Sequence, residues 1–193
     1  MSKILFGKPV AENLDLKSKT IFEKYTTKND IPPVLTAITV GDNPASLLYV
    51  SVKEKKAEEL GVNFNWIKLK ENTSDKELQD TISDFSESSQ GMIIQLPLPK
   101  HLNIEKIIDL IPNEIDVDGL TTFSLGKLYS ENLKIIPATS LAILELLAHY
   151  EIDTEDRNIV IAGRSRLVTS PLSKILSSKK YNGNVSVIHS KTS

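Results

Sequence analysis

Apolar residues recur along the chain with two alternating periods. Short runs rich in β-branched residues predict strands over residues 34–40, 64–69, 91–96, 158–162 and 185–188. The segments between them carry apolar residues at helical spacing and predict helices over residues 11–27, 44–60, 104–110, 139–150 and 167–178, with a further helix after Ser74. Strands joined by helices need crossover connections, so the pattern predicts an α/β fold with mostly parallel sheets.

Local signals mark where two of these helices begin. Asp42 or Asn43 can cap the helix that starts at Pro44. Ser74 stands three residues before Glu77, which is the spacing of a capping box.

The series of predicted strands and helices breaks near residue 150. We therefore expect an N-terminal α/β domain over residues 1–149 and a partial second domain over residues 150–193, which supplies only two strands.

Composition narrows the classes of function. The chain has 193 residues, 40% of them hydrophobic, and a net charge of −2, which argues against a protein that coats nucleic acid or an acidic membrane. It has no cysteine and three separated histidines, so we expect neither a disulfide framework nor a metal site. No apolar stretch approaches the length of a membrane span, and no signal-peptide pattern opens the chain. A cytoplasmic protein is the expectation.

The helix predicted over residues 44–60 carries the first candidate chemistry. Tyr49 and Lys53 are four residues apart and share one helical face. A lysine beside an aromatic ring can act on a substrate stacked on that ring, and a desolvated lysine can serve as an acid or a base. The alternative is an ordinary solvated face, because Lys55 and Lys56 lie close by among several glutamates.

Two further polar segments carry candidate chemistry, one at the end of a predicted strand and one in a predicted loop. Gln95 ends an apolar strand and is followed by Leu96-Pro97-Leu98-Pro99. The carboxyl ends of parallel strands are where ligands bind in such sheets, so Gln95 could orient a catalytic group or could only satisfy loop backbone. The segment from Asp116 to Asp118 offers two carboxylates before Gly119, a residue that permits a left-handed turn. These carboxylates could accept paired N–H bonds from a ligand or form a simple turn.

The last predicted strand–turn–helix unit suits a phosphate. Gly163-Arg164-Ser165 follows a strand and precedes a helix, the geometry that places a phosphate at a helix N-terminus. The next strand ends in His189-Ser190-Lys191-Thr192, without the acidic residue that holds the ribose of NAD. This favours a 2′-phosphate and hence NADP. The alternative is a βαβ unit with a basic surface.

Taken together, these segments resemble the bifunctional methylenetetrahydrofolate dehydrogenase/methenyltetrahydrofolate cyclohydrolase family. The matching runs, in chain order, are Val40-Gly41-Asp42 with Pro44, Ser46, Tyr49 and Lys53; Gly91 to Pro99 with His101; Asp116 to Gly119 with Gly126 and Leu128; Pro137 with Thr139; Gly163-Arg164-Ser165 with Val168 and Pro171; and His189-Ser190. The resemblance covers essentially the whole chain. It implies an N-terminal catalytic, folate-binding domain, the start of a Rossmann-like NADP-binding domain, and a homodimer.

The resemblance also implies a role for each matched residue on the folate side. Lys53 would be the catalytic residue that helps to form and open the one-carbon bridge and relays protons to water. Tyr49 would stack on the folate, and Gln95 would tune the charge state of Lys53. Ser46, Asp118 and Leu98 would complete the substrate contacts, Ser46 by supporting the Lys53 site and Asp118 by holding the pterin ring.

On the cofactor side, the resemblance assigns NADP to Gly163, Arg164, Ser165 and Ser190. The implied reactions are NADP-dependent oxidation of 5,10-methylenetetrahydrofolate to 5,10-methenyltetrahydrofolate and hydrolysis of that product to 10-formyltetrahydrofolate, in one-carbon metabolism.

This sequence departs from the family's pattern at several places. Ile115 replaces a lysine and Ser124 an asparagine, while Ser140 and Thr169 stand where the family has proline and glycine. Most of these changes lie on the cofactor side, and family members continue beyond the length of this chain. Two alternatives therefore remain: a relative in which the cyclohydrolase step dominates, and a non-catalytic folate-binding relative with a degraded cofactor site.

Overall fold

The computed structural model describes residues 4–130 and 135–192. The chain divides into two compact units. One comprises Asn13–Val117, and the other combines the segment up to Glu12 with the segment from Asp118 onward. Residues 118–149 thus group with the C-terminal segment. The expected functional boundary at residue 149 stays a prediction. The opening residues 1–3, on which the signal-peptide argument partly rests, lie outside the described residues.

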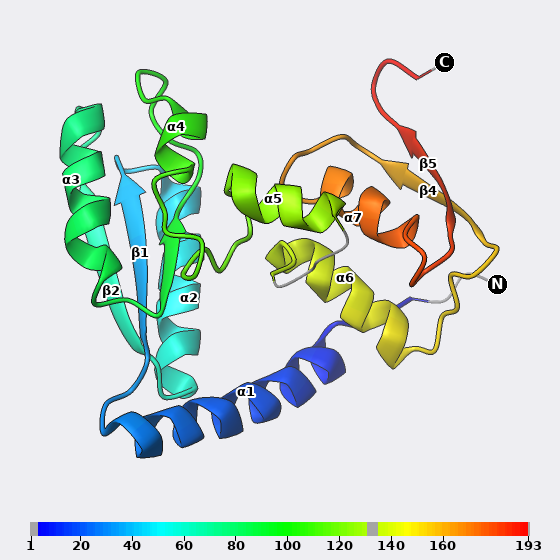
Figure 1. The fold of residues 1–193 in the computed structure, drawn as a ribbon, viewed down its shortest axis with the longest axis horizontal. Helices are drawn as coiled ribbons and strands as arrows, with labels where there is room; N and C mark the ends of the chain where they lie inside the picture. The colour runs from blue at the N-terminus through cyan, green and yellow to red at the C-terminus, as the bar shows by residue number, and fades with distance from the viewer. Residues whose placement is uncertain (1–3, 131–134, 193) are drawn as a thin grey trace. The chain divides into compact units, whose positions relative to one another are not determined.

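The first unit is built around a three-stranded parallel sheet in the order β2-β1-β3 (Figure 1). Its elements in chain order are α1 (Lys8–Asn29), which begins in the N-terminal segment, β1 (Val34–Val40), α2 (Pro44–Glu59), β2 (Asn63–Leu69), α3 (Asp75–Ser86), β3 (Gly91–Ile94) and α4 (Ile104–Ile108). Val34 pairs with Asn63 at the start of β2, and Leu35 pairs with Gly91 at the start of β3.

Both faces of this sheet are covered, which explains why its central strand, β1, is apolar except for two threonines. Ile38 and Met92 pack with Leu78 of α3 on one face. Ala37 and Ile93 pack with α2 on the other. Because side chains alternate along a strand, a strand buried on both faces reads as a continuous apolar run rather than an alternating one. The two buried threonines of β1 are hydrogen-bonded, Thr36 to Ser89 and Thr39 to Trp66.

In the residues that the structure describes, the second unit holds a two-stranded parallel sheet and the helices of the segment from Asp118 onward (Figure 1). Its elements are α5 (Thr122–Tyr129), α6 (Ala138–His149), β4 (Asn158–Ala162), α7 (Thr169–Leu176) and β5 (Asn184–Ile188). Asn158 pairs with Asn184, and the register continues to Ala162 and Ile188. The core consists of Leu128, Leu144, Ile161, Leu172, Ile175 and Leu176.

The α/β class with parallel sheets is confirmed, and every predicted strand is present within two residues of its expected ends. The strand predicted over residues 91–96 is shorter, because ladder pairing with β1 stops at Ile94. Helix α5 was not predicted. Gly126 interrupts the apolar pattern of this helix. Its N-terminal signal is a single residue, Thr121, whose side chain accepts a hydrogen bond from Ser124 N. No helix in the described part of the chain is long and apolar enough to cross a membrane.

Candidate active site

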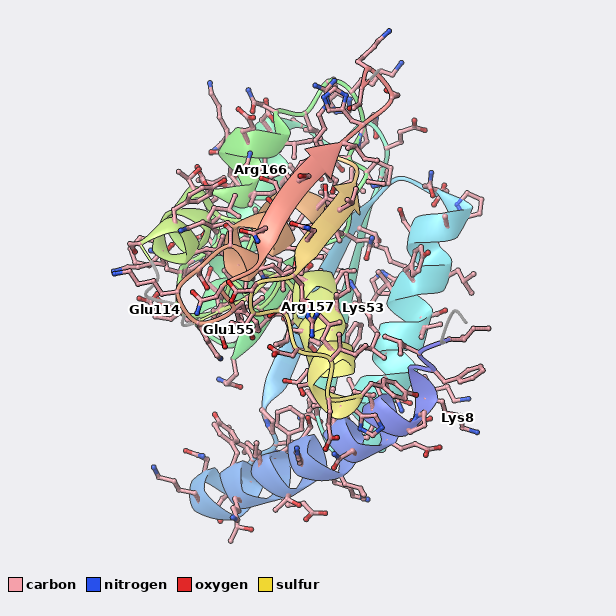
Figure 2. All side chains as sticks on the ribbon, turned by 90° about the vertical axis from the view of Figure 1, so that its right-hand side faces the viewer. Lys8, Lys53, Glu114, Glu155, Arg157 and Arg166 are labelled. Atoms are coloured by element: carbon pink, nitrogen blue, oxygen red, sulfur yellow. The ribbon has the colours of Figure 1, made fainter. Side chains whose placement is uncertain are left out.

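Lys53 and Gln95, which are 42 positions apart in the sequence, are in direct contact. Lys53 lies on α2 (Figure 2), and its Nζ donates a hydrogen bond of 3.1 Å to Gln95 Oε1. Both residues are half-buried. Gln95 reaches this position because it directly follows β3, and its own N–H still donates to the Ile38 carbonyl of β1. The end of the sheet therefore fixes where the amide is presented to the lysine.

The Leu96 carbonyl orients this pair. Gln95 Nε2 donates to it at 2.8 Å, and the buried Ser46 donates its hydroxyl to the same oxygen at 3.4 Å. A lysine ammonium only donates and a carbonyl only accepts, so both contacts of Gln95 require the same amide orientation. Ser46 is itself fixed at the start of α2, where its N–H donates to the capping residue Asn43. The amide thus satisfies loop backbone and holds the lysine at once.

Tyr49 lies one helical turn before Lys53 on α2 and is 63% exposed. A flat ring exposed to this degree beside a fixed amine is available to stack on a planar ligand. Lys56, on the same helix, has different surroundings. Its Nζ contacts Asp15 at 2.9 Å and Glu59 at 2.8 Å on the surface. Helix α2 therefore has both a solvated ion-pair face and the contact made by Lys53.

A hollow of about 880 Å³ opens at the carboxyl ends of β1, β2 and β3. It is lined by Val40, Gly41, Asp42, Asn43, Glu71, Pro97, Leu98, Pro99, Lys100 and His101. Lys53 and Gln95 are not among these residues, so this hollow and the lysine–amide pair are separate features. The two are joined through the chain, because Gln95 and the buried Leu98 belong to the same loop. His101 secures that loop through a hydrogen bond of 2.8 Å between Nε2 and the Thr73 carbonyl.

Asp118 belongs to the second unit and is half-buried. The predicted turn is present, since Gly119 follows it with φ +64°. A side chain at Gly119 would meet Ile135 and Pro137 within 3.3 Å, so the turn packs closely against the segment that leads into α6. The other carboxylate of the motif, Asp116, is almost fully buried, and its backbone pairs with Met92.

A second hollow, of about 430 Å³, lies at the carboxyl ends of β4 and β5. Its lining includes three of the four residues predicted to hold a dinucleotide, namely Gly163, Arg164 and Ser190, together with Ala162, Ile188 and His189. Gly163 has φ +131°, a conformation that L side chains rarely adopt. Its N–H donates to the Ile188 carbonyl at 2.7 Å, which joins the start of the loop to β5.

The fourth predicted residue, Ser165, faces its own loop. Its hydroxyl oxygen accepts hydrogen bonds from the N–H groups of Leu167 and Val168, each at 3.2 Å. The hydroxyl hydrogen remains able to donate to an anion. Arg164 is exposed, and β5 is followed by His189 and Ser190 without a carboxylate. These residues fit a phosphorylated dinucleotide, because the hollow presents a guanidinium, the Ser190 hydroxyl and no acidic side chain, and Ser165 lies on the adjoining loop.

Comparison with known proteins gives the family. Residues 5–118 match the catalytic-domain model of tetrahydrofolate dehydrogenase/cyclohydrolase, and residues 137–193 match its NAD(P)-binding domain. The chain belongs to this family. It is 38% identical to the bifunctional protein FolD of Streptococcus mutans over its whole length, which is 68% of that protein. It is 42% identical to FolD of Thermodesulfovibrio yellowstonii over 99% of this chain and 66% of that protein.

Solved structures of family members have the same fold. The FolD dehydrogenase/cyclohydrolase of Campylobacter jejuni matches with a TM-score of 0.92 at 34% identity, covering 98% of this chain and 67% of that one. The methylenetetrahydrofolate dehydrogenase of the silkworm Bombyx mori matches with a TM-score of 0.93 at 32% identity, covering 100% of this chain and 70% of that one. The chain therefore spans about two thirds of the length of these relatives.

Two features of the site were not predicted from the sequence. The first is that the Leu96 carbonyl accepts hydrogen bonds from both Gln95 and Ser46. A backbone acceptor cannot be predicted from the pattern of residue types. The buried hydroxyl of Ser140 contacts the loop that precedes α7. Its only signal in the sequence is a serine where the family has a proline.

Proposed function

We propose that this chain carries out the NADP-dependent oxidation of 5,10-methylenetetrahydrofolate to 5,10-methenyltetrahydrofolate and the hydrolysis of that product to 10-formyltetrahydrofolate. The observation that carries the proposal is the contact between Lys53 and Gln95 in a member of this family. It gives a fixed amine at the end of a parallel sheet, which is the group that proton transfer at a one-carbon bridge requires.

In this proposal, Lys53 moves protons at the bridge nitrogen and at the attacking water. Gln95 holds the Nζ of Lys53 through its Oε1, and the Leu96 carbonyl prevents the amide from turning. Tyr49 stacks on the folate from the same helix, and Asp118 accepts N–H bonds from the pterin ring. Fixing the amine before the substrate arrives reduces the entropy lost on reaching the transition state.

NADP, when bound, accepts the hydride that leaves the methylene bridge. Gly163, Arg164, Ser165 and Ser190 would hold it. The exposed Arg164 guanidinium and the hydroxyls of Ser165 and Ser190 suit phosphate oxygens, and Gly163 allows a close approach to the backbone. The absence of a carboxylate after β5 supports NADP over NAD, because an acidic residue there would repel a 2′-phosphate.

Two assays on the purified 193-residue chain test the proposal. One follows NADP reduction with methylenetetrahydrofolate, and the other follows the loss of methenyltetrahydrofolate. Both activities are expected, and both should depend on Lys53. A chain that binds folate but catalyses neither reaction would contradict the proposal and support the non-catalytic alternative.

One observation favours a second candidate, an enzyme in which the hydrolytic step dominates. A methyl group of Thr169 lies 3.2 Å from the position that a Cβ on Gly163 would occupy. The side chain of Thr169 therefore fills space beside the glycine of the cofactor loop, where the family has a second glycine. Hydrolysis without NADP reduction in the paired assays would select this candidate.

The homodimer that the resemblance implies is part of the same proposal, as is a location in the cytoplasm. Sedimentation of the purified chain tests the dimer directly, since one species of twice the mass of the 21.4 kDa chain is expected.

A further inference from the structure

We infer that Ser140 is a positioning residue for the cofactor loop, defined here as residues 163–168. The inference rests on the proposed function, because it concerns how the chain prepares its NADP site. Ser140 lies in the first turn of α6 and is fully buried. It is not one of the residues that line the hollow at β4 and β5. Any effect it has on NADP must therefore pass through the loop.

The contact that carries the inference joins α6 to the end of the cofactor loop. Ser140 Oγ donates to the Val168 carbonyl at 3.0 Å. The same carbonyl accepts the N–H of Leu172 at 3.0 Å, which is the first helical bond of α7. Val168 directly precedes α7 as its N-terminal capping residue, and its side chain makes no capping hydrogen bond. Ser140 thus attaches α6 to the point where the loop becomes a helix.

The loop is held at both of its ends. At the start, Gly163 N donates to the Ile188 carbonyl of β5 at 2.7 Å, and at the end Val168 accepts from Ser140. The residues between, 164–167, are exposed. Several of their hydrogen bonds are local, for example those that Ser165 Oγ accepts from the N–H groups of Leu167 and Val168, while Arg166 Nη2 donates to the Leu120 carbonyl at 3.5 Å. Local bonds define the shape of a loop, but they do not fix it to the sheet.

The two end contacts, together with that of Arg166, therefore set where Arg164 and Ser165 stand relative to the hollow. Binding groups that are fixed before a ligand arrives lose less conformational entropy when it binds. Release of the Val168 end would let the exposed segment sample more conformations and would weaken phosphate binding. The family's proline at this position has no hydroxyl and could not make this contact. The contact is thus a feature of this chain, which also differs from the family at Thr169, one residue after the loop.

Ser140→Ala tests the inference directly. NADP binding is measured by titration calorimetry on the full 193-residue chain, and hydrogen exchange of amides 164–168 is measured on the protein alone. We expect NADP to bind about five- to tenfold more weakly, as suits the loss of one buried hydrogen bond. The KM for NADP should rise by a similar factor while kcat at saturating NADP is retained. The loop amides should exchange faster while those of β4 do not.

Three further variants separate positioning from a general effect on folding. Ser140→Thr keeps the hydroxyl and should bind NADP within about twofold of the unmodified chain. Ser140→Cys keeps the volume but donates weakly, so it should bind NADP as weakly as is expected for Ser140→Ala. It provides the test if the alanine variant does not fold. Ser173→Ala removes a similar hydroxyl-to-carbonyl bond inside α7, where Ser173 Oγ donates to the Ser170 carbonyl at 2.8 Å, and should leave NADP binding unchanged.

Unchanged NADP binding in Ser140→Ala and Ser140→Cys would overturn the inference. So would equal weakening in Ser173→Ala, since the effect would then reflect loosening of α7 in general. Failure of the unmodified chain to bind NADP would overturn the proposed function and this inference together. That case is recognised because the unmodified protein itself fails, whereas failure of the inference alone leaves its binding intact.

Discussion

Lys53 and Arg164, the two cations predicted to act on the reactants, have very different surroundings. Lys53 is half-buried and bonded to a side chain 42 positions away, and that side chain is held by the end of a sheet covered on both faces. Arg164 is exposed, in a loop whose bonds are mostly local. The first site is fixed by the core of its unit, and the second by a few contacts along a loop.

This difference indicates how each site should respond to mutation. Proton transfer depends on one group in one position. Removal of the fixed amine should therefore remove its whole contribution to the rate. Anion binding is shared among a guanidinium, hydroxyls and backbone N–H groups, so the loss of one donor removes only a part. Substitutions at Lys53 and Gln95 should therefore have large effects on turnover, and those at the cofactor loop should have moderate effects on affinity.

The largest expected effect is that of Lys53→Met. The methionine fills a similar volume but cannot move a proton, and it leaves Gln95 Oε1 without its donor. Both activities should fall by about a thousandfold, within the usual range for removal of an acid–base group. Steady-state assays of both reactions measure this. Lys56→Met on the same helix is the matched control, and equal turnover in the Lys53 variant and the unmodified chain would remove Lys53 from the mechanism.

Gln95→Leu should have the next largest effect. It removes the acceptor for Lys53 and the donor to the Leu96 carbonyl while keeping most of the volume. The lysine would remain but lose its fixed position, so we expect kcat to fall by about tenfold to a hundredfold. The pH profile of kcat should also change, because Gln95 fixes the amine that moves the proton. Gln79→Leu on the exposed side of α3 is the control, and a loss of stability without a change in the profile would indicate a purely structural role.

Much of this first site could be predicted from the sequence. Tyr49 and Lys53 share a helical face because of their spacing, and Gln95 lies at the carboxyl end of an apolar strand, where parallel sheets bind ligands. The contact between Lys53 and Gln95 depends on α2 covering the face of the sheet that carries Ile93, which helical periodicity alone does not state. The end of β3 at Ile94 was predicted two residues late, because the apolar pattern continues through Leu96 while the ladder pairing does not.

The second site was less predictable for a physical reason. Gly163 and Arg164 predict a loop that suits a phosphate. The attachment of that loop, however, depends on the hydroxyl of Ser140, which lies 28 residues before Val168 in the sequence. A buried serine in the first turn of a helix looks like an ordinary helix start. Helix α5 was missed on similar grounds, since Gly126 in its middle breaks an already short pattern. Tertiary contacts decide both cases.

Arg164→Ala should have a moderate effect that is confined to the cofactor. Removal of one phosphate contact should weaken NADP binding by about tenfold, with little change in NAD binding or in methenyltetrahydrofolate hydrolysis. Thermal unfolding with each dinucleotide measures this, because a ligand raises the melting temperature according to its affinity. NADP should protect the unmodified chain more than NAD, and the variant should lose that difference. Arg157→Ala, at the opposite end of β4, is the control (Figure 2). Equal protection by the two dinucleotides in the unmodified chain would contradict the assignment.

The smallest expected effect concerns the ion pairs of Lys56, the solvated counterpart of Lys53. The hydrogen bonds that Lys56 donates to Glu59 and to Asp15 raise the pKa of Lys56 above its usual range, and the bond to Glu59 lowers the pKa of that carboxyl group. A carboxylate with a lowered pKa stabilises the fold above its ordinary value of 4.5, and that contribution is lost as the pH falls through the lowered value. Glu59→Gln should therefore melt slightly below the unmodified chain at neutral pH, and the difference should vanish in acid. High salt should also reduce it, because all three side chains are solvated. A difference that persists in acid and in salt would show that Glu59 acts through packing rather than charge.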